Sequence, residues 1–372
     1  MEIQTPQSAP WEAFVVCFLL LLAPTVASPR LSPLWRVASL AILMAVALFT
    51  SSGELAYLAI SASALLHADS ARSRSVTGAA VLAISAAVSA AVAAAISQNA
   101  LTAAFVLSCL AIALRAGVLP LHLGAASLCE RMPLIQTRQL SSMIALVFVH
   151  LRFVDHHTGA ADLGPWLVRY GALAAITAAL LAIVQKDLRG FYRATTAMHG
   201  GLLIAALGTA ALGNFAAALL VAVSMGLALG GLGMMITSLE ERVGPVAFAG
   251  PGGRGTVFPR LAVLFALFGG AGVGMPGTSS FVADDVLLHT LWMASPAATV
   301  TVIVSSAVLA VATLVTISRV FLGRATPSLA PDLGLRERLV GVALVLLLVT
   351  LGVVPGVLLV PADAFLSGVP GE

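Results

Sequence analysis

The chain has 372 residues, of which 60% are hydrophobic and only 9% are charged. Soluble domains carry about 25% charged residues, so this composition excludes a soluble globular protein and indicates one that crosses a membrane repeatedly. The formal net charge of +3 is too small to suggest a nucleic-acid partner.

The N-terminal region and the cysteines give no sign of processing or metal binding. Glu2 precedes the first apolar segment without a basic region or a cleavage motif, so we expect this segment to be kept as a span. Cys17, Cys109 and Cys129 are scattered in apolar surroundings and predict neither a disulfide framework nor a metal site. Because no nucleotide-binding motif is present either, we expect no cofactor and no catalytic site within this chain.

Apolar segments long enough to cross a bilayer, which takes about 20 residues, recur along the whole chain. We count eleven, at residues 11–28, 34–66, 76–97, 100–125, 134–154, 166–186, 195–212, 214–237, 259–294, 297–322 and 337–360. They predict an all-α polytopic membrane protein that forms a single transmembrane domain over residues 1–372. The segment at 34–66 is long for one straight helix, and we interpret its excess length as a helical extension.

Two of these segments contain a break. Residues 100–125 include Pro120, which lacks a backbone donor and should end the helix there. Residues 259–294 include Gly-Met-Pro-Gly at 274–277, with Pro276 between two apolar halves. Broken helices in separate halves of a chain are typical of transporter sites, because the freed backbone groups need a protein-lined or wet surrounding.

Basic residues divide unequally between the loops. With the N-terminus and alternate loops on one side, 14 Lys and Arg residues fall on that side, and the other side receives 4, which are Arg30, Arg36, Arg152 and Arg169. The positive-inside rule places the more basic side in the cytoplasm. This predicts a multi-pass protein of the cell's inner (cytoplasmic) membrane, with a cytoplasmic N-terminus and an external C-terminus.

Polar groups within the apolar segments are candidates for an ion path. Arg115 lies in an otherwise uncharged stretch, where a cation costs about 2.5–3.5 kcal/mol on insertion scales, so we expect it to be paired with a carboxylate or with backbone carbonyls. The titratable candidates are Glu54, His122, His199, Asp284 and Asp285. Simpler roles stay open for each: the histidines as packing residues, Glu54 at an interface, and the aspartates outside the membrane if their span ends early.

Several blocks resemble, in the same order, segments of the antiporter-like membrane subunits of respiratory complex I, which Mrp-type cation/proton antiporters share. Arg115–His122, with Glu130 eight residues later, resembles their KSAQxPLHxWLPxAME segment. Gln185–Thr196 resembles their QTDIKRxLAYST block, and Gly274–Asp285 resembles their GxPPxxGFxSKxE break. The end of the last span also fits the final helix of the family.

This family has about fourteen helices and two inverted five-helix repeats. The resemblance implies that our eleven segments match its helices four to fourteen, with the first three missing. It also implies a first repeat at about 11–154, a second repeat at about 166–322 and a final helix at about 337–360.

The departures from the family pattern concern its charged residues. The lysine of the first broken helix is Arg115 here, the lysine of the eleventh helix is Ala228, and the lysine of the second break is Asp284. The histidine of the eighth helix becomes Leu140, and Glu54 matches the glutamate of the fifth helix only three or four residues off register. The resemblance still implies Glu54 as the carboxylate partner of Arg115.

From the residues and the resemblance together we predict a proton path and a set of structural positions. The path comprises Glu54, Arg115, His122, Glu130, His199, Asp284 and Asp285, and the structural positions are Pro120, Asp187 and Pro276.

Two functions remain for this chain. The first is a membrane subunit of a multi-subunit ion-translocating complex that moves protons or uses their gradient, in a redox-driven pump, an Mrp-like antiporter or an inorganic-carbon uptake system. As an enzyme it would be at most a subunit of a proton-translocating oxidoreductase. The alternative is a non-conducting scaffold that docks a peripheral enzyme or other membrane subunits, which the missing lysines favour. The expected partners are such subunits, the lipid bilayer, and protons or cations.

Overall fold

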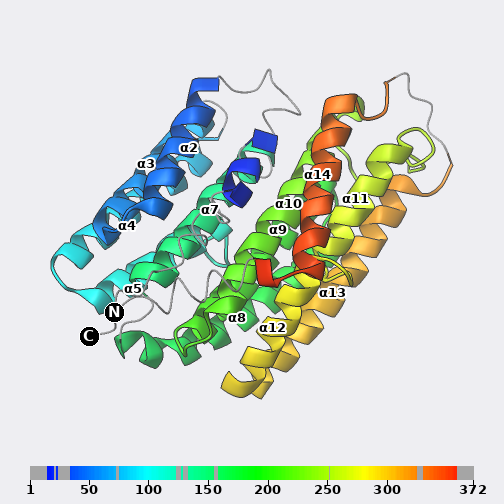
Figure 1. The fold of residues 1–372 in the computed structure, drawn as a ribbon. Helices are drawn as coiled ribbons and strands as arrows, with labels where there is room; N and C mark the ends of the chain where they lie inside the picture. Colours follow the sequence, from blue (N-terminus) through cyan, green and yellow to red (C-terminus); the bar gives the residue numbers. More distant parts are fainter. Residues whose placement is uncertain are drawn as a thin grey trace.

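The computed structural model describes residues 15–20, 22–23, 34–72, 75–122, 127–128, 133–154, 158–250, 252–324 and 330–357. Within these ranges the chain is a bundle of long helices that lie roughly along one direction (Figure 1). The helices are α2 (Leu34–Phe49), α3 (Gly53–Arg72), α4 (Val76–Ser97), α5 (Leu101–Ala116), α7 (Pro133–Phe153), α8 (Thr158–Ile183), α9 (Leu188–Ala210), α10 (Phe215–Val243), α11 (Pro259–Ala271), α12 (Ser279–Ala294), α13 (Pro296–Phe321) and α14 (Leu335–Val353). The all-α polytopic prediction is therefore confirmed, and α4, α8, α10 and α13 are each long and apolar enough to cross a bilayer.

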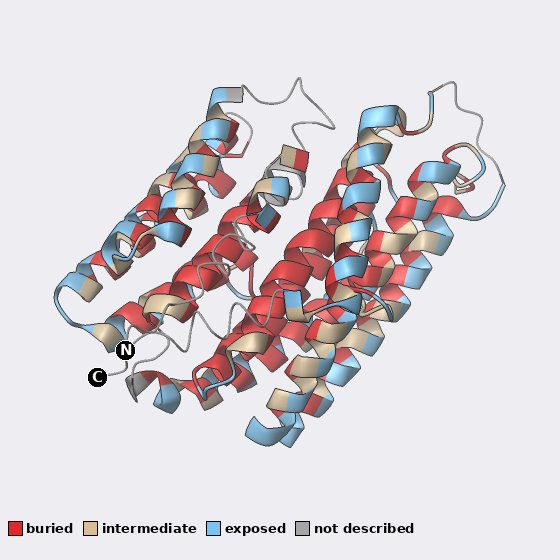
Figure 2. Cartoon of the chain, viewed as in Figure 1, coloured by how far each residue is buried: buried red, intermediate tan, exposed pale blue. Residues whose placement is uncertain are grey.

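The helix α10 forms the centre of the bundle. Its residues are buried without interruption from Ala217 to Ile236, and it packs against α7, α9, α11, α12 and α14 (Figure 2). A helix that is apolar on every side is stable only inside a protein or a membrane, and α10 accordingly lies between α7 and the later helices α9, α11, α12 and α14.

The helices α8 and α9 approach each other through glycines. A Cβ atom added to Gly201 would lie 2.6 Å from the backbone nitrogen of Ala175, and one added to Gly208 would lie 2.7 Å from the carbonyl oxygen of Gly164. Gly171 is likewise in backbone contact with Ala205. In lipid, close backbone approach of this kind replaces the hydrophobic effect as a source of helix association.

The single span predicted at 34–66 is wrong, because this segment forms two helices, α2 and α3, that pack side by side (Figure 1). The turn between them is made by Thr50, Ser51 and Ser52. The amide of Ser52 donates to the Thr50 hydroxyl (3.2 Å), and the Ser52 hydroxyl accepts from the amide of Leu55 in the first turn of α3 (3.4 Å). Hydroxyl side chains compete with the helix for backbone groups in this way, which ends α2 and begins α3.

The extra helix changes the side of one arginine. Arg36, near the start of α2, forms an ion pair with Asp69 at the end of α3 (2.8 Å). Arg36 therefore lies at the same end of the bundle as Arg72, which we call the basic end, and it moves from the smaller predicted group of basic residues to the larger one. Arg30 lies outside the described residues.

Both predicted breaks are present. The second break, residues 272–278, separates α11 from α12 and contains Pro276, and its Gly274 and Gly277 have φ angles of +74° and +86° that favour glycine. The first break, residues 117–122, follows α5. It does not begin at Pro120, as the sequence suggested, because α5 already ends at Ala116, where Gly117 adopts the left-handed conformation (φ +69°) of a helix C-terminus.

Candidate functional site

Arg115 is buried in the last turn of α5, with 1% of its surface exposed. Its Nε donates to the hydroxyl of Ser85 on α4 (2.9 Å), and its Nη2 donates to the carbonyl oxygen of Ile60 on α3 (3.1 Å). Its Nη1 lies 3.5 Å from the hydroxyl of Ser142 on α7. The cation is thus held by neutral dipoles from three other helices, which offset part of its desolvation cost.

The expected pairing of Arg115 with a backbone carbonyl is confirmed by its contact with Ile60, but Glu54 is not its partner. Glu54 is exposed in the first turn of α3, six residues before Ile60, which is about 9 Å along the helix. The first turn of a helix favours a carboxylate through the helix dipole, which accounts for Glu54 at this end of α3.

A buried amide group lies beside Arg115 at the first break. The Gln139 amide nitrogen donates to the carbonyl oxygen of Arg115 (3.3 Å), and the Ser142 hydroxyl donates to the carbonyl oxygen of Gln139 (2.9 Å). Among the described residues, the side-chain oxygen of Gln139 has no hydrogen-bond partner although it is buried. A buried acceptor in this position is a suitable place for an ordered water molecule next to the end of α5.

A second buried network lies further along α5 and was missed by the sequence analysis. The hydroxyl of Ser108 lies 2.6 Å from the phenolic oxygen of Tyr57 on α3 and 2.9 Å from Nδ1 of His150 on α7. Ser108 precedes Arg115 by seven residues, about 10 Å along the same face of α5. This two-turn spacing of polar residues in an apolar helix was the available signal.

Another buried histidine lies toward the basic end. His67 on α3 contacts the carbonyl oxygen of Ser63 through Nδ1 (2.7 Å) and is seven residues beyond Ile60. His150 lies at the opposite end of the bundle, two residues before Arg152, which donates to the carbonyl oxygen of Thr50 in the turn after α2 (2.8 Å). The buried groups therefore form what we call the polar column, which comprises His67, Arg115, Tyr57, Ser108 and His150.

His199 and its neighbour Gly200 place α9 between the two breaks. Nδ1 of the buried His199 contacts the carbonyl oxygen of Thr195 (2.9 Å), and its Cε1 atom lies 3.9 Å from the position of a Cβ atom added to Gly272 in the second break. On the other side, a Cβ atom added to Gly200 would lie 2.9 Å from the carbonyl oxygen of Ala116, where the first break begins. The middle of α9 is therefore in contact with both interruptions.

The two adjacent aspartates of α12 point in different directions. A Cβ atom added to Gly274 would lie 2.6 Å from Oδ2 of Asp284, so this half-buried carboxylate lies against the second break. Asp285 is exposed on the outer face of α12, together with His289 one turn later. Only Asp284 of this pair therefore lies beside the second break, which His199 also contacts.

The remaining predicted positions lie apart from these groups. His122 is half-buried in the first break and contacts the carbonyl oxygen of Pro120 through Nδ1 (3.2 Å). Asp187 is the N-cap of α9, with its carboxylate accepting from the amide of Gly190 (2.7 Å). Glu130 lies outside the described residues.

The central helix α10 carries no titratable side chain between Phe215 and Glu240. Ala228, which the resemblance aligns with the family's lysine, is buried, and the nearby polar contact is a hydrogen bond from the Tyr192 hydroxyl to the carbonyl oxygen of Leu229 (3.0 Å). Arg115 at the first break and Asp284 at the second are therefore separated by α10, whose spanning part carries no charged group.

Residues 10–310 match the profile of a family described as NADH:quinone oxidoreductase/Mrp antiporter, TM. NADH-quinone oxidoreductase subunit M of Escherichia coli (strain K12) is 26% identical over 254 residues, which cover 66% of this chain and 50% of that protein. NAD(P)H-quinone oxidoreductase chain 4 from the chloroplast of Cycas taitungensis is 26% identical over 185 residues, 48% of this chain and 37% of that one. The chain thus spans about half the length of the curated relatives it matches most extensively.

Solved structures share the fold over nearly the whole chain. A chain of respiratory complex I from Thermus thermophilus with bound NADH superposes with a TM-score of 0.85 at 20% identity, covering 98% of this chain and 85% of that one. A chain of the Mrp complex from Dietzia sp. DQ12-45-1b gives a TM-score of 0.77 at 17% identity, covering 95% and 82%.

Proposed function

The chain belongs to the NADH:quinone oxidoreductase/Mrp antiporter transmembrane family, and on that basis we propose that it is a membrane subunit of a multi-subunit complex that moves protons or uses their gradient. The complex is a redox-driven pump, an Mrp-like antiporter or an inorganic-carbon uptake system. Arg115 carries this proposal, because it is a buried cation held by neutral groups beside a broken helix. An apolar residue would fill that place in a structural bundle at lower cost.

The first half of the chain, about residues 11–154, contributes the polar column to this path. Arginine keeps its proton under nearly all conditions, so Arg115 supplies a fixed positive charge and the histidines carry the protons. The steps of about 10 Å along α3 and α5 exceed hydrogen-bond distance, so water at the free Gln139 oxygen and side-chain motion must complete them.

The second half, about residues 166–322, contributes His199 and Asp284 beside the second break. In this proposal protons cross between the halves where His199 and Gly200 lie between the two breaks. Glu54, His122 and Asp285 then lie at the periphery of the path, and the role of Glu130 stays a prediction.

A non-conducting scaffold is the second candidate function, and one observation favours it. The spanning part of α10 has no titratable side chain, and Ala228 stands where the family carries a lysine. A path across the centre would have to use hydroxyls, backbone and water alone.

Both functions involve a protein partner on the outer face of α12. Asp285 is nine residues from the end of α12, about 14 Å, which places it near the middle of the bilayer. A carboxylate facing lipid there costs about 2.5–3.5 kcal/mol. We therefore assign Asp285 and His289 to a contact with a helix of another subunit that offers a cation or a hydrogen-bond donor.

The orientation follows from the basic end of the bundle. We propose that this end faces the cytoplasm, so that the Val353 end of α14 points outward. Leu20 lies beside Gly226 near the middle of α10, so we also propose that the first apolar segment, whose described residues 15–20 and 22–23 are helical, crosses the membrane. Because α2 and α3 are separate spans, the Val15 end of this first segment then also points outward. The eleven-span count had placed that end in the cytoplasm.

Reporter fusions test this topology. Reporters fused before Val15 and after Val353 should both give external signals, and one inserted at Gly244, between α10 and α11, should give a cytoplasmic signal. Fusions showing the two ends on opposite sides would contradict the separate crossing of α2 or of the first segment.

Proton flux tests the second-half residues. In vesicles that hold the purified complex, His199→Ala and Asp284→Asn should each lower proton flux about 10- to 100-fold, because each removes a titratable group beside the second break. Asp162→Asn, at an exposed site on α8, is the matched control and should leave flux unchanged. Full flux in both assembled variants would favour the scaffold function instead.

A further inference from the structure

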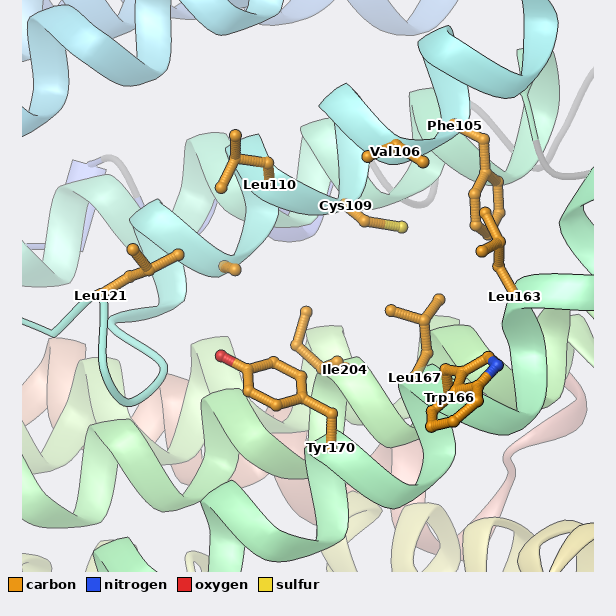
Figure 3. A pocket seen from close by; sticks show the side chains of 11 residues that line it. Phe105, Val106, Cys109, Leu110, Leu121, Leu163, Trp166, Leu167, Tyr170 and Ile204 are labelled. Carbon is orange, nitrogen blue, oxygen red and sulfur yellow. The ribbon is translucent and has the colours of Figure 1, made fainter.

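A lateral cavity of about 350 Å³ lies between α5, α8 and α9. Figure 3 shows side chains of α5 facing those of α8 across it, with Ile204 contributed by α9. The lining is apolar apart from the thiol of Cys109 and the phenol of Tyr170, and the Tyr170 hydroxyl is already used as a donor to the carbonyl oxygen of Leu119 (2.7 Å). The cavity therefore offers no free polar group to a hydrophilic ligand.

The cavity follows the length of α5 and opens sideways from the bundle. It extends from Phe105 to Ala113, about 12 Å along α5, and reaches Leu121 in the first break. On its rim Trp166 is 66% exposed and Val106 is 48% exposed. Because its walls are spanning helices, this opening faces the hydrocarbon of the bilayer.

A cation lies next to this opening. The guanidinium carbon of Arg169 is 5.6 Å from the ring centroid of Trp166, one turn away on α8. Arg169 is exposed and lies near the middle of α8, where it lines a hollow with Ser295 between α12 and α13, opposite the basic end. Long cationic side chains at such a depth extend toward the headgroups, and tryptophan is enriched at the same level.

We propose that this cavity holds one acyl chain of an anionic phospholipid from the outer leaflet, with Arg169 beside the lipid phosphate. The volume is within the range of about 300–1,000 Å³ for ligand sites, while a partner helix, about 10 Å across with its side chains, is too wide for it. An empty apolar cavity would forfeit dispersion contacts on both walls, and acyl chains surround its opening. This inference is independent of whether the chain conducts protons.

The bound chain would support the first break. It would pack against Ala113 and Leu121 on either side of the end of α5, and against Tyr170, whose hydroxyl holds the carbonyl of Leu119. Occupancy would thus fix the segment that follows Arg115.

The test uses the purified protein in nanodiscs with spin-labelled phosphatidylglycerol or phosphatidylcholine. The wild type should show a motionally restricted lipid component, with about two- to five-fold preference for phosphatidylglycerol, as expected for one exposed ion pair. Arg169→Gln should remove this preference and keep the restricted component. Ala113→Phe and Leu110→Trp, which fill the cavity from different positions, should each reduce that component, while Ala103→Phe on the exposed face of α5 should not.

Two results would overturn the inference. One is a restricted component of equal size in the wild type and in folded Ala113→Phe and Leu110→Trp proteins, which would place the lipid elsewhere. The other is an undiminished phosphatidylglycerol preference in Arg169→Gln, which would separate the headgroup from this cavity. Helical content and melting temperature of each variant establish that it is folded.

Discussion

Replacing Arg115 with methionine should abolish proton flux through the complex while leaving its assembly nearly intact. Methionine fills a similar volume and removes a buried charge whose three described acceptors are all neutral. Removing the buried charge saves its desolvation cost, whereas the hydroxyls of Ser85 and Ser142 lose a hydrogen-bond donor. Because these two effects oppose each other, we expect the free energy of unfolding to change by less than about 2 kcal/mol. Flux measured in vesicles and thermal unfolding of the same preparation separate the two effects.

Two further substitutions at this position serve as controls. Arg115→Lys keeps the charge but not the forked geometry, and should keep part of the flux. Arg115→Ala leaves a cavity as well, and should cost about 2–5 kcal/mol of stability in addition to the flux. If Arg115→Met assembles and conducts like the wild type, the fixed charge has no part in transport.

Replacing Gly201 with valine should destabilise the protein strongly. Its Cβ atom would lie 2.6 Å from the nitrogen of Ala175 and 2.9 Å from the carbonyl oxygen of Gly171, and both are backbone atoms that cannot rotate away. The helices α8 and α9 would have to separate, at a cost of about 3 kcal/mol. Because α9 also carries His199 and Gly200 to the two breaks, flux should fall with stability.

The control for this change is Ala161→Val, which places the same valine side chain at an exposed site on α8. Its melting temperature should match that of the wild type. A Gly201→Val protein with wild-type melting temperature and yield would show that the α8–α9 contact tolerates separation, contrary to the packing described here.

The sequence predicted the spans well wherever local signals decided them. The helix α4 has the predicted bounds 76–97, and the Gly-Met-Pro-Gly segment marked the second break, since proline and glycine act through their own backbone. The same reasoning failed at residues 50–52, where three hydroxyl residues looked compatible with a membrane helix. It also placed the first break at Pro120, whereas the helix ends earlier, because Gly117 adopts the left-handed conformation.

The polar contacts were less predictable because they join distant parts of the chain. The free-energy cost of a cation in an apolar segment predicted that Arg115 would be paired. Its partners Ile60, Ser85 and Ser142 could not be predicted, because they depend on how four helices pack. Glu54 was chosen from the family pattern, and its off-register position was already a sign against it. His150 and Tyr57 are 42 and 51 residues from Ser108, and no local pattern joins them.

The polar column ends at His150, which gives a direct test of conduction through the first half. His150→Asn places an amide where Nδ1 contacts the Ser108 hydroxyl, so the hydrogen bond is retained while the titratable ring is lost. Proton flux should therefore be measured in vesicles that hold the assembled His150→Asn complex, beside the wild type. We expect flux to fall at least about 10-fold with unchanged assembly; flux equal to that of the wild type would contradict a proton path through this column.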